Sequence, residues 1–573
     1  MAAIAVGGAT MIASPAQAAE NPQPKIEQPL PAVVSDAELA DRQAKFWKSQ
    51  DKPAADRPAE MRSGEPSESP RTIDPKIIGG VNAPSGEAPW MTQLYYQDAD
   101  GNGYFCGGAL IAPSKVLTAA HCAYGVDWVN TGYVVAGATQ LATESSLNGG
   151  KAAAVKRVWI NPGYNDDTLK GDVAVLTLDR PLPFKTLSTV TPTDTASYTA
   201  GTNATVYGWG RTTGTPGSGI TETLQKATLP IQADSACPGF AGGQDFFVPG
   251  QMLCAGNPAS GADAGTVSPC NGDSGGPLIV NGRIAGVVSW GAVDCVEKGA
   301  RSVYAKMSAF SVPVTRVLND ANLTDDNKAD LFARKSAGAA YIYTSRGTSL
   351  GSPEAIGDWS GVNLVRQTDF NRDSNQDLVY RMTNGDLYVE RAQWSDTTEE
   401  YTWLRTKIGA GWQTKRNITF PGDLSGDLVP DVVASDTAGN LFMWKGRTNG
   451  TLQPGVKIGS GWSTYSVFGN GDFSGDGKPD LIARDSSARM WMYKGTGSAT
   501  APLGSRVLAG AGWKFTAYAT TGDMSGDGKP DFIVRDSAGA MWAWKGTGSA
   551  TSPFSGTQKI KIGAGWNGFN VFG

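Results

Sequence analysis

The sequence predicts an all-β fold, on three observations. Glycine supplies 73 of the 573 residues, against a usual share of about 7%, which favours short strands and tight turns over long helices. From residue 77 to about 320 the chain alternates short β-branched runs with Gly, Pro, Asn and Asp, the pattern of a barrel or sandwich. From residue 321 onward a block of about 50 residues recurs five times, as in repeat arrays and propellers.

Composition and charge argue against two classes of partner. The chain has a net charge of −5, with neither a basic stripe nor an acidic tail, so no nucleic-acid partner is expected. No stretch reaches the run of about 18 apolar residues that a membrane-spanning helix needs, so no membrane partner is expected either. The length of 573 residues exceeds a single core and predicts at least two large domains.

The N-terminal region has the character of an exported precursor. Residues 1–19 are predicted to be a signal peptide, because an apolar run ends in the small-residue site AQA. The basic beginning usual in such peptides is missing, which a true start codon farther upstream would explain. Residues 20–76 are rich in Pro, Glu and Ala; Ser35 and Glu38 have capping-box spacing there, so this stretch is either a short helix or a disordered linker. The expected product is secreted and extracellular.

Six cysteines lie in one central block, and none forms a CxxC pair, which argues against a zinc site. Their even number predicts three disulfides, which persist in an oxidising compartment, and this agrees with export. The six are Cys106, Cys122, Cys237, Cys254, Cys270 and Cys295.

The repeats of residues 321–573 carry two markers in phase. One is an acidic loop, such as GDFSGDGKPD from Gly471, and the other is a tryptophan segment such as IGAGW. On these markers the region resembles the FG-GAP or VCBS repeats of integrin-type propellers, which implies a β-propeller of about five blades. The first repeat lacks a tryptophan strand before its loop, whereas the chain ends with one, GWNGFNVFG. We expect the last strand to complete the first blade and close the ring.

The acidic loops are candidate calcium sites. Oxygen-bearing side chains alternate around a turn, and calcium binds about six to eight oxygens in flexible geometry; the alternative is an Asx-rich turn without an ion. We expect a structural ion, with occupancy highest in the fourth and fifth loops and lowest in the first. The candidate ligands are Asp472, Ser474, Asp476 and Asp480 in the fourth loop, Asp523, Ser525, Asp527 and Asp531 in the fifth, Asp423, Asp427 and Asp431 in the third, and Asp369, Asn371, Asp373 and Asp377 in the second.

Three separated motifs supply the parts of a nucleophilic catalytic site. His121, the single histidine of the chain, follows the apolar run VLTA, Asp172 precedes the strand AVLTL, and Ser274 lies in the loop CNGDSGGPL. Acyl transfer by a hydroxyl needs an imidazole base and a carboxylate that fixes its tautomer. Glycines beside the nucleophile let backbone N–H groups face a developing oxyanion. A lone histidine is more often structural, so its interpretation depends on these companions.

Residues 77 to about 318 resemble the chymotrypsin/trypsin family of serine endopeptidases. The motifs IIGG, CGGALIAPSKVLTAAHC, GDVAVLTL, GWG, CNGDSGGPL and VVSWG occur in the family's order and spacing. The resemblance implies two six-stranded antiparallel barrels over residues 77–320, with the active site between them. It implies Ser274 as nucleophile, His121 as base and then acid, and Asp172 as its orienting carboxylate. Proteins or peptides would be cleaved through an acyl-enzyme, without a cofactor for catalysis.

The family's activation chemistry also carries over. Residues 20–76 would be a propeptide, and cleavage after Lys76 would free an amino terminus at Ile77. That amine would pair with Asp273, which in this family orders the substrate pocket and the oxyanion hole.

Further residues are implied to contact the substrate. The amides of Gly272 and Ser274 would form the oxyanion hole, and Ser289, Trp290 and Gly291 would pair with the backbone of an extended substrate. The disulfides that the resemblance implies are Cys106–Cys122, Cys237–Cys254 and Cys270–Cys295.

The specificity pocket departs from the trypsin pattern. The base of the pocket, six residues before the nucleophile, is Ser268, where an Asp would select Lys or Arg. Ser302 stands on the pocket wall where the family usually has Gly, while Gly291 leaves the opposite wall open. We therefore expect a chymotrypsin-like preference for apolar residues at the cleavage point. An enzyme with such a pocket would cleave poorly after Lys76, so a separate trypsin-like protease is expected to activate the chain.

A rival interpretation is a catalytically silent adhesin or binding protein that uses the repeat domain. It requires a broken triad, and the triad motifs are complete. The propeller could equally be a stabilising appendage or a docking module for an extracellular matrix or cell-surface ligand, since its fold does not select a function.

Overall fold

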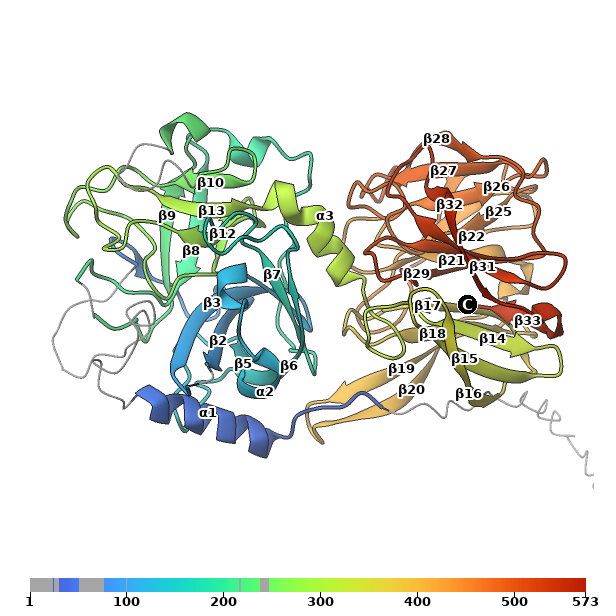
Figure 1. Ribbon diagram of the computed structural model, residues 1–573, viewed down its shortest axis with the longest axis horizontal. Coiled ribbons are helices and arrows are strands. Elements are labelled where there is room, and N and C mark those ends of the chain that lie inside the picture. Colours follow the sequence, from blue (N-terminus) through green and yellow to red (C-terminus); the bar gives the residue numbers. More distant parts are fainter. Residues whose placement is uncertain (1–23, 25–29, 51–76, 99, 216–217, 238–246) are drawn as a thin grey trace, which may run out of the picture.

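The structure, a computed structural model, describes residues 24, 30–50, 77–98, 100–215, 218–237 and 247–573. The predicted signal peptide and the cleavage residue Lys76 lie outside the described residues. Two β-rich bodies lie side by side, and helix α3 (Met307–Leu318) leads from the first to the second (Figure 1). Helix α1 (Asp36–Gln50) runs along the first body. The all-β prediction is confirmed.

The first sheet is a closed six-stranded antiparallel barrel in the order β2-β3-β4-β7-β6-β5. A tight turn joins β3 to β4, whereas longer segments connect β4 to β5, β5 to β6 and β6 to β7. The interior of the barrel is filled by Val, Leu and Ala side chains. A 3-10 turn, η3 (Ala120–Cys122), and helix α2 (Trp128–Thr131) follow β4. The strands are β2 (Met91–Gln97), β3 (Gly103–Ala112), β4 (Lys115–Thr118), β5 (Tyr133–Ala136), β6 (Lys151–Ile160) and β7 (Ala174–Leu178).

The second sheet has seven strands, in the order β1-β9-β8-β11-β12-β13-β10. A bridge between Ile231 and Ala255 joins the chain after β9 to the end of β10, so the sheet curls round on itself. The resemblance implied six strands, and the additional one is the two-residue β1, which pairs with β9. The elements are β1 (Val81–Asn82), η4 (Ala196–Tyr198), β8 (Asn203–Gly208), β9 (Gln225–Pro230), η5 (Asp234–Ala236), β10 (Met252–Ala255), β11 (Pro277–Val280), β12 (Arg283–Trp290) and β13 (Ser302–Lys306).

The repeats form a propeller of five four-stranded blades, as predicted. The first blade contains β14 (Leu331–Lys335), β15 (Ala339–Ser345), β16 (Leu350–Asp358) and β33 (Phe569–Phe572), and the second contains β17 (Val362–Thr368), β18 (Asp377–Met382), β19 (Leu387–Ser395) and β20 (Glu400–Gly409). The third contains β21 (Arg416–Gly422), β22 (Asp431–Ser435), β23 (Leu441–Trp444) and β24 (Val456–Gly459), and the fourth contains β25 (Ser466–Phe468), β26 (Leu481–Arg484), β27 (Met490–Gly495) and β28 (Leu503–Gly510). The fifth contains β29 (Ala517–Gly522), β30 (Asp531–Arg535), β31 (Met541–Gly546) and β32 (Phe554–Gly563). Two 3-10 turns, η6 (Trp412–Thr414) and η7 (Trp566–Gly568), carry tryptophans of the repeat.

The last strand closes the ring, as the end of the sequence predicts. Strand β33 pairs antiparallel with β14, placing Val571 opposite Arg334, and so completes the first blade. The repeated tryptophans contact aromatic rings of the following blade in tilted or edge-on geometry. Trp513, for example, lies 4.9 Å from Trp544, centroid to centroid, and Trp566 lies 4.8 Å from Tyr343. The tryptophan markers therefore correspond to contacts that join each segment between two blades to the blade that follows it.

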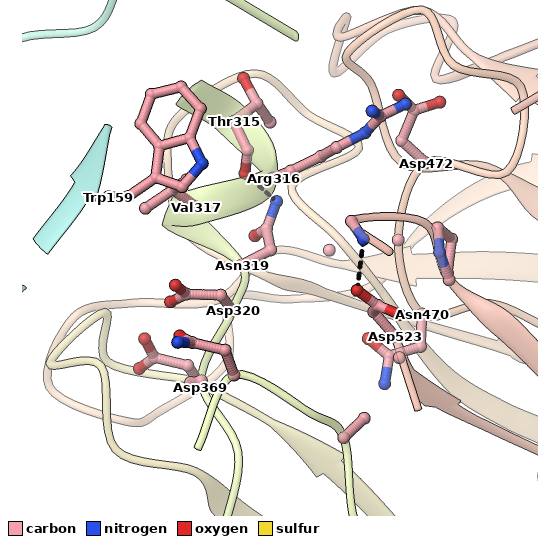
Figure 2. A pocket seen from close by; sticks show the side chains of 18 of the residues that line it. Trp159, Thr315, Arg316, Val317, Asn319, Asp320, Asp369, Asn470, Asp472 and Asp523 are labelled. Carbon is pink, nitrogen blue, oxygen red and sulfur yellow. Dashed lines mark hydrogen bonds between the residues drawn. The ribbon is translucent and has the colours of Figure 1, made fainter. Parts of the chain in front are cut away.

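The propeller packs against the first barrel through its first two acidic loops. Ser114 Oγ lies 2.7 Å from Ser374 Oγ, Lys115 Nζ donates to Asp320 Oδ1 at 2.7 Å, and Lys156 Nζ lies 3.1 Å from Asp325 Oδ2. A cavity of about 430 Å³ lies at this junction. Figure 2 shows Arg316 of α3 reaching across it toward Asp472. None of the three predicted triad residues lines this cavity.

Candidate active site

The register of two barrel strands brings His121 and Asp172 together. Thr118 of β4 pairs with Ala174 of β7, so the segments that follow β4 and precede β7 lie at the same end of the barrel. His121 Nδ1 lies 2.8 Å from Asp172 Oδ2, and the His121 backbone N–H donates to Asp172 Oδ1 at 2.9 Å. The carboxylate is buried, whereas 24% of the imidazole is exposed. The far edge of the ring therefore remains accessible.

The pair stabilises a charged carboxylate next to a basic imidazole. Burial alone would raise the pKa of Asp172, but the charge and hydrogen bonds of His121 bring it below its ordinary value. Burial would likewise lower the pKa of His121, and the neighbouring Asp172 raises it above its usual value. The Ser289 hydroxyl adds a third hydrogen bond, donating to Asp172 Oδ2 at 2.5 Å. The side chain of Ser289 thus orients the carboxylate, a role separate from the predicted pairing of its backbone with substrate.

Ser274 lies where the two sheets meet. The backbone N–H of Gly107, in β3 of the first barrel, donates to the Ser274 carbonyl at 2.8 Å. Gly275 has a φ of +80° and presses against Thr118 Oγ1 and the Gly107 carbonyl, so a side chain there would collide with both. The loop that carries Ser274 is thus held against the segment that leads into His121.

The loop immediately before Ser274 has no room for side chains. Gly272 has a φ of +96°, and a Cβ there would lie 2.6 Å from Ile220 Cγ2 and 3.0 Å from Gly210 Cα. A glycine is therefore required for the backbone to turn at this point, next to the hydroxyl.

Asp273 is a buried carboxylate, and no cationic side chain among the described residues pairs with it. It is 0% exposed, and it accepts hydrogen bonds from the Gly210 N–H at 2.7 Å and the Cys270 N–H at 2.8 Å. Burial raises its pKa to about 7. Ile77 is also fully buried, and the adjacent Ile78 carbonyl accepts from the Ser268 N–H at 3.1 Å. Two backbone N–H groups therefore donate to a carboxylate that is fully buried.

The two serines of the predicted specificity pocket touch each other. Ser268 Oγ lies 2.9 Å from Ser302 Oγ, and Ser268 Oγ also donates to the Pro269 carbonyl at 2.9 Å. On the opposite wall, a Cβ at Gly291 would lie 3.9 Å from Ser302 Cα. The floor of the predicted specificity pocket thus carries two hydroxyls in contact, in place of a carboxylate.

Comparisons with known proteins agree with this geometry. The family model described as Trypsin matches residues 77–312, and the model described as FG-GAP-like repeat matches residues 472–534. A trypsin of Saccharopolyspora erythraea is 38% identical over 234 residues, which cover 94% of that protein and 41% of this chain. The chain belongs to the trypsin family. Trypsin I-P1 of Gallus gallus is 33% identical over 87% of its length, and a trypsin-like protease of Streptomyces glaucescens is 35% identical over 87% of its length. The chain is accordingly a serine endopeptidase.

The protease contains all three disulfides that the resemblance implies, and no free cysteine occurs among its described residues. Cys106–Cys122 ties β3 to η3 beside His121, and Cys270–Cys295 ties the Ser274 loop to the chain after β12. Cys237–Cys254 completes the set. Such bonds fit an oxidising compartment. No helix in the described part of the protease is long and apolar enough to cross a membrane.

A buried arginine beside the pocket was not found from the sequence. Arg211 is 4% exposed, and its guanidinium donates to Asn271 Oδ1 at 2.6 Å, the Thr215 carbonyl at 3.0 Å and the Val293 carbonyl at 3.2 Å. It links the Ser274 loop, through Asn271, to the loops that carry Thr215 and Val293. No local motif marks it, because its partners come from three separate stretches of chain.

The fifth acidic loop of the protease brings three carboxylates together, of which Asp531 is buried and Asp527 exposed. In the fifth loop, oxygens of Asp523, Asp527 and Asp531 lie within 4.8 Å of one another. The Ser525 hydroxyl donates to Asp523 Oδ1 at 3.3 Å, and Lys545 Nζ lies 3.5 Å from Asp527 Oδ2. This donor set fits a hard cation such as calcium.

The last aspartate of the third, fourth and fifth loops is buried in the same way. Burial raises the pKa of Asp431, Asp480 and Asp531 to about 7. Lysines reach the third and fourth loops as they do the fifth, with Lys445 2.8 Å from Asp427 and Lys494 3.0 Å from Asp476. The second loop is the most enclosed, since its four candidate ligands are each at most 9% exposed; they are Asp369, Asn371, Asp373 and Asp377.

Proposed function

We propose that this protease is made as a secreted zymogen and hydrolyses peptide bonds through Ser274, His121 and Asp172. The observation that carries the proposal is the 2.8 Å contact of His121 Nδ1 with the buried Asp172. Asp172 would hold the proton on Nδ1, leaving Nε2 free as the base.

The proposed mechanism assigns one role to each of these residues. His121 Nε2 takes the hydroxyl proton while Ser274 Oγ attacks the substrate carbonyl carbon, and the carbonyl π bond becomes an oxyanion. The amides of Gly272 and Ser274 donate to this oxyanion. The imidazolium, stabilised by Asp172, then gives its proton to the leaving amine as the C–N bond breaks, which forms the acyl-enzyme. A water molecule then attacks the acyl-enzyme carbonyl carbon with His121 as base. The ester bond to Ser274 Oγ breaks, which releases the carboxylic acid product and restores the serine hydroxyl.

Active-site labelling tests this function. A fluorophosphonate probe should label Ser274 once the chain is cut after Lys76, because only an activated serine attacks phosphorus at a useful rate. Peptide mapping would locate the label. Absence of labelling in a cut and folded chain would support the catalytically silent adhesin instead.

Activation and export complete the proposal. Cleavage after Lys76 would free the Ile77 amine, and the buried Asp273 supports this because it lacks a recorded cationic partner in the uncut chain. A separate trypsin-like protease would make the cut. Export by a signal peptide over residues 1–19 is supported by the disulfides.

The pocket favours apolar residues at the cleavage point, such as Leu, Met, Phe or Tyr. The hydroxyls of Ser268 and Ser302 satisfy each other, so no charge awaits a Lys or Arg side chain. Ser302 also adds bulk to the wall opposite Gly291.

Ser302→Gly should raise kcat/KM for Phe relative to Leu substrates by about 10-fold, because removing the side chain widens the pocket. Kinetics on matched peptides would measure the ratio. Ser268→Ala serves as the control, since it removes a hydroxyl without widening the wall, and its ratio should stay unchanged. Preferred cleavage after Lys or Arg by the unmodified enzyme would contradict the assignment.

We propose calcium as a structural ligand of the acidic loops. At a free calcium concentration 100-fold above the dissociation constant, one occupied site would add about 2.7 kcal/mol to the free energy of unfolding. A chelator should therefore lower the melting temperature of the propeller. Asp531→Asn should reduce the calcium-dependent increment. Asp536→Asn is the control, because Asp536 is a half-buried aspartate outside the acidic loops that accepts the Ala540 N–H and the Trp542 Nε1–H, each at 2.9 Å. A melting temperature unchanged by calcium or chelator would argue for ion-free turns.

The propeller would dock the enzyme to an extracellular matrix or cell-surface ligand. Because its first two acidic loops pack against the first barrel, a ligand would have to bind away from that junction.

A further inference from the structure

The segment before the activation site is folded onto the protease. Ser35 Oγ accepts the Glu38 N–H at 3.2 Å and so caps α1, which decides between the two alternatives left open for this stretch in favour of a helix. Leu39 and Phe46, two helical turns apart, are 5% and 3% exposed. The Phe46 ring lies 4.9 Å from the Tyr95 ring of β2, and both residues belong to one apolar cluster with Trp209. The helix thus completes a core of the protease.

Polar contacts fix the position of the helix along the barrel. Arg42, 6% exposed, donates to the Val129 carbonyl at 3.0 Å and the Gly132 carbonyl at 2.9 Å, at the end of α2. Gln43 donates to the Thr143 carbonyl, and Gln97 Nε2 donates to the Lys45 carbonyl at 3.1 Å. Three side chains and the helix backbone therefore specify a single docked register.

The residues before the helix lie where barrel and propeller meet. The Val34 N–H donates to Asp179 Oδ2 at 2.8 Å, and Asp36 pairs with Arg180 at 2.7 Å. The same Arg180 lies over the ring of Trp394 in β19, 4.7 Å from its centroid. Figure 1 shows the chain before α1 running from the barrel toward β19 and β20. The segment bridges both bodies.

We propose that residues 30–50 remain bound after cleavage, as a second, noncovalent chain that fastens the first barrel to the propeller. This rests on the proposed cut after Lys76, which lies 26 residues beyond Gln50 and leaves the described contacts unchanged. No cysteine lies in residues 20–76, so no disulfide can hold the fragment. The recorded contacts of α1 involve β2, β3, β5, β6 and α2, and none involves a triad residue. The segment is a structural subunit and not a plug of the active site.

A defined cut tests retention independently of natural activation. Thr72→Asp, Ile73→Asp and Pro75→Asp, with the native Asp74 and Lys76, create the sequence DDDDK for enteropeptidase in the full chain. Ser274→Ala prevents self-digestion. After cutting, the fragment should elute with residues 77–573 in native size exclusion at a one-to-one ratio by mass spectrometry, and separate only in denaturant.

Variants of the docking face give the second measurement. Phe46→Ala should release the fragment from the cut protein, and Arg42→Gln, a milder change, should speed its exchange with added labelled peptide 30–50 at least tenfold. Lys45→Ala is the control on the same helix, because its side chain is 63% exposed. A wild-type fragment that elutes apart from a folded 77–573 would overturn the proposal. Failure of the cut chain without Ser274→Ala to react with the fluorophosphonate would instead count against the proposed function and leave the retention result intact.

Discussion

His121→Ala should lower kcat on a peptide substrate by about 10⁶-fold, because Ser274 would lose the base that takes its proton. Asp172→Asn should cost about 10⁴-fold, since an amide no longer fixes the productive tautomer. Both variants should keep the fold, which circular dichroism would check. Asp167→Asn is the matched control, because the same change is made at an exposed position five residues before Asp172. A residual rate within tenfold of wild type in His121→Ala would rule out the triad.

The pH profile separates a chemical role of Asp172 from a structural one. The chain has one histidine, and in the cut enzyme the Ile77 amine would keep Asp273 charged, so an inflection of activity near neutral pH is assigned to His121 or to that amine. Activity should rise with pH through the pKa of His121, because the base acts in its neutral form. Asp172 raises that pKa, so Asp172→Asn should move the inflection to lower pH. A purely structural role would leave the inflection where it was.

Asp273→Asn should lower kcat/KM of the cut enzyme by about 10²–10⁴-fold, because losing one partner of a buried ion pair costs about 3–5 kcal/mol. The amine of Ile77 would be left without its carboxylate, and the Gly272 turn without its support. Active-site titration before and after cutting at Lys76 would measure the effect. Equal activity in the cut wild-type and variant chains would exclude this activation route.

The same carboxylate predicts a pH dependence for the uncut chain. The folded-state pKa of Asp273 is about 7, whereas an unfolded Asp has a pKa of about 3.9. Between these values the folded chain holds a proton that the unfolded chain has released, so the contribution of Asp273 to stability falls as pH rises from 4 to 7. Denaturant unfolding measures the free energy of unfolding of the uncut Ser274→Ala chain and of the same chain with Asp273→Asn. The difference between the two free energies should change between about pH 4 and pH 7. Cutting after Lys76 should weaken the change, because the Ile77 amine then compensates the carboxylate.

Repetition made the propeller predictable from the sequence. The spacing of its acidic loops and tryptophans gave the number of blades, and the unmatched strand at the end predicted the β33–β14 pairing that closes the ring. Short motifs likewise identified the triad candidates, and the resemblance that these motifs carry implied the cysteine pairs that the structure contains.

Contacts between distant parts of the chain could not be predicted in this way. Ser289 and Asp172 are 117 positions apart, and Val34 and Asp179 are 145 apart. Arg211 has no motif, and the enclosure of the second acidic loop depends on the barrel beside it.

The sequence by itself determined the all-β class, the five repeats and the residues able to perform acyl transfer, since local periodicity and spacing set these features. Only the tertiary structure decided that Ser289 orients Asp172, that Arg211 links three loops, and that α1 is part of the protease core. The physical reason is that burial and hydrogen-bond partners arise when distant segments pack together, and packing depends on the shape of the whole molecule.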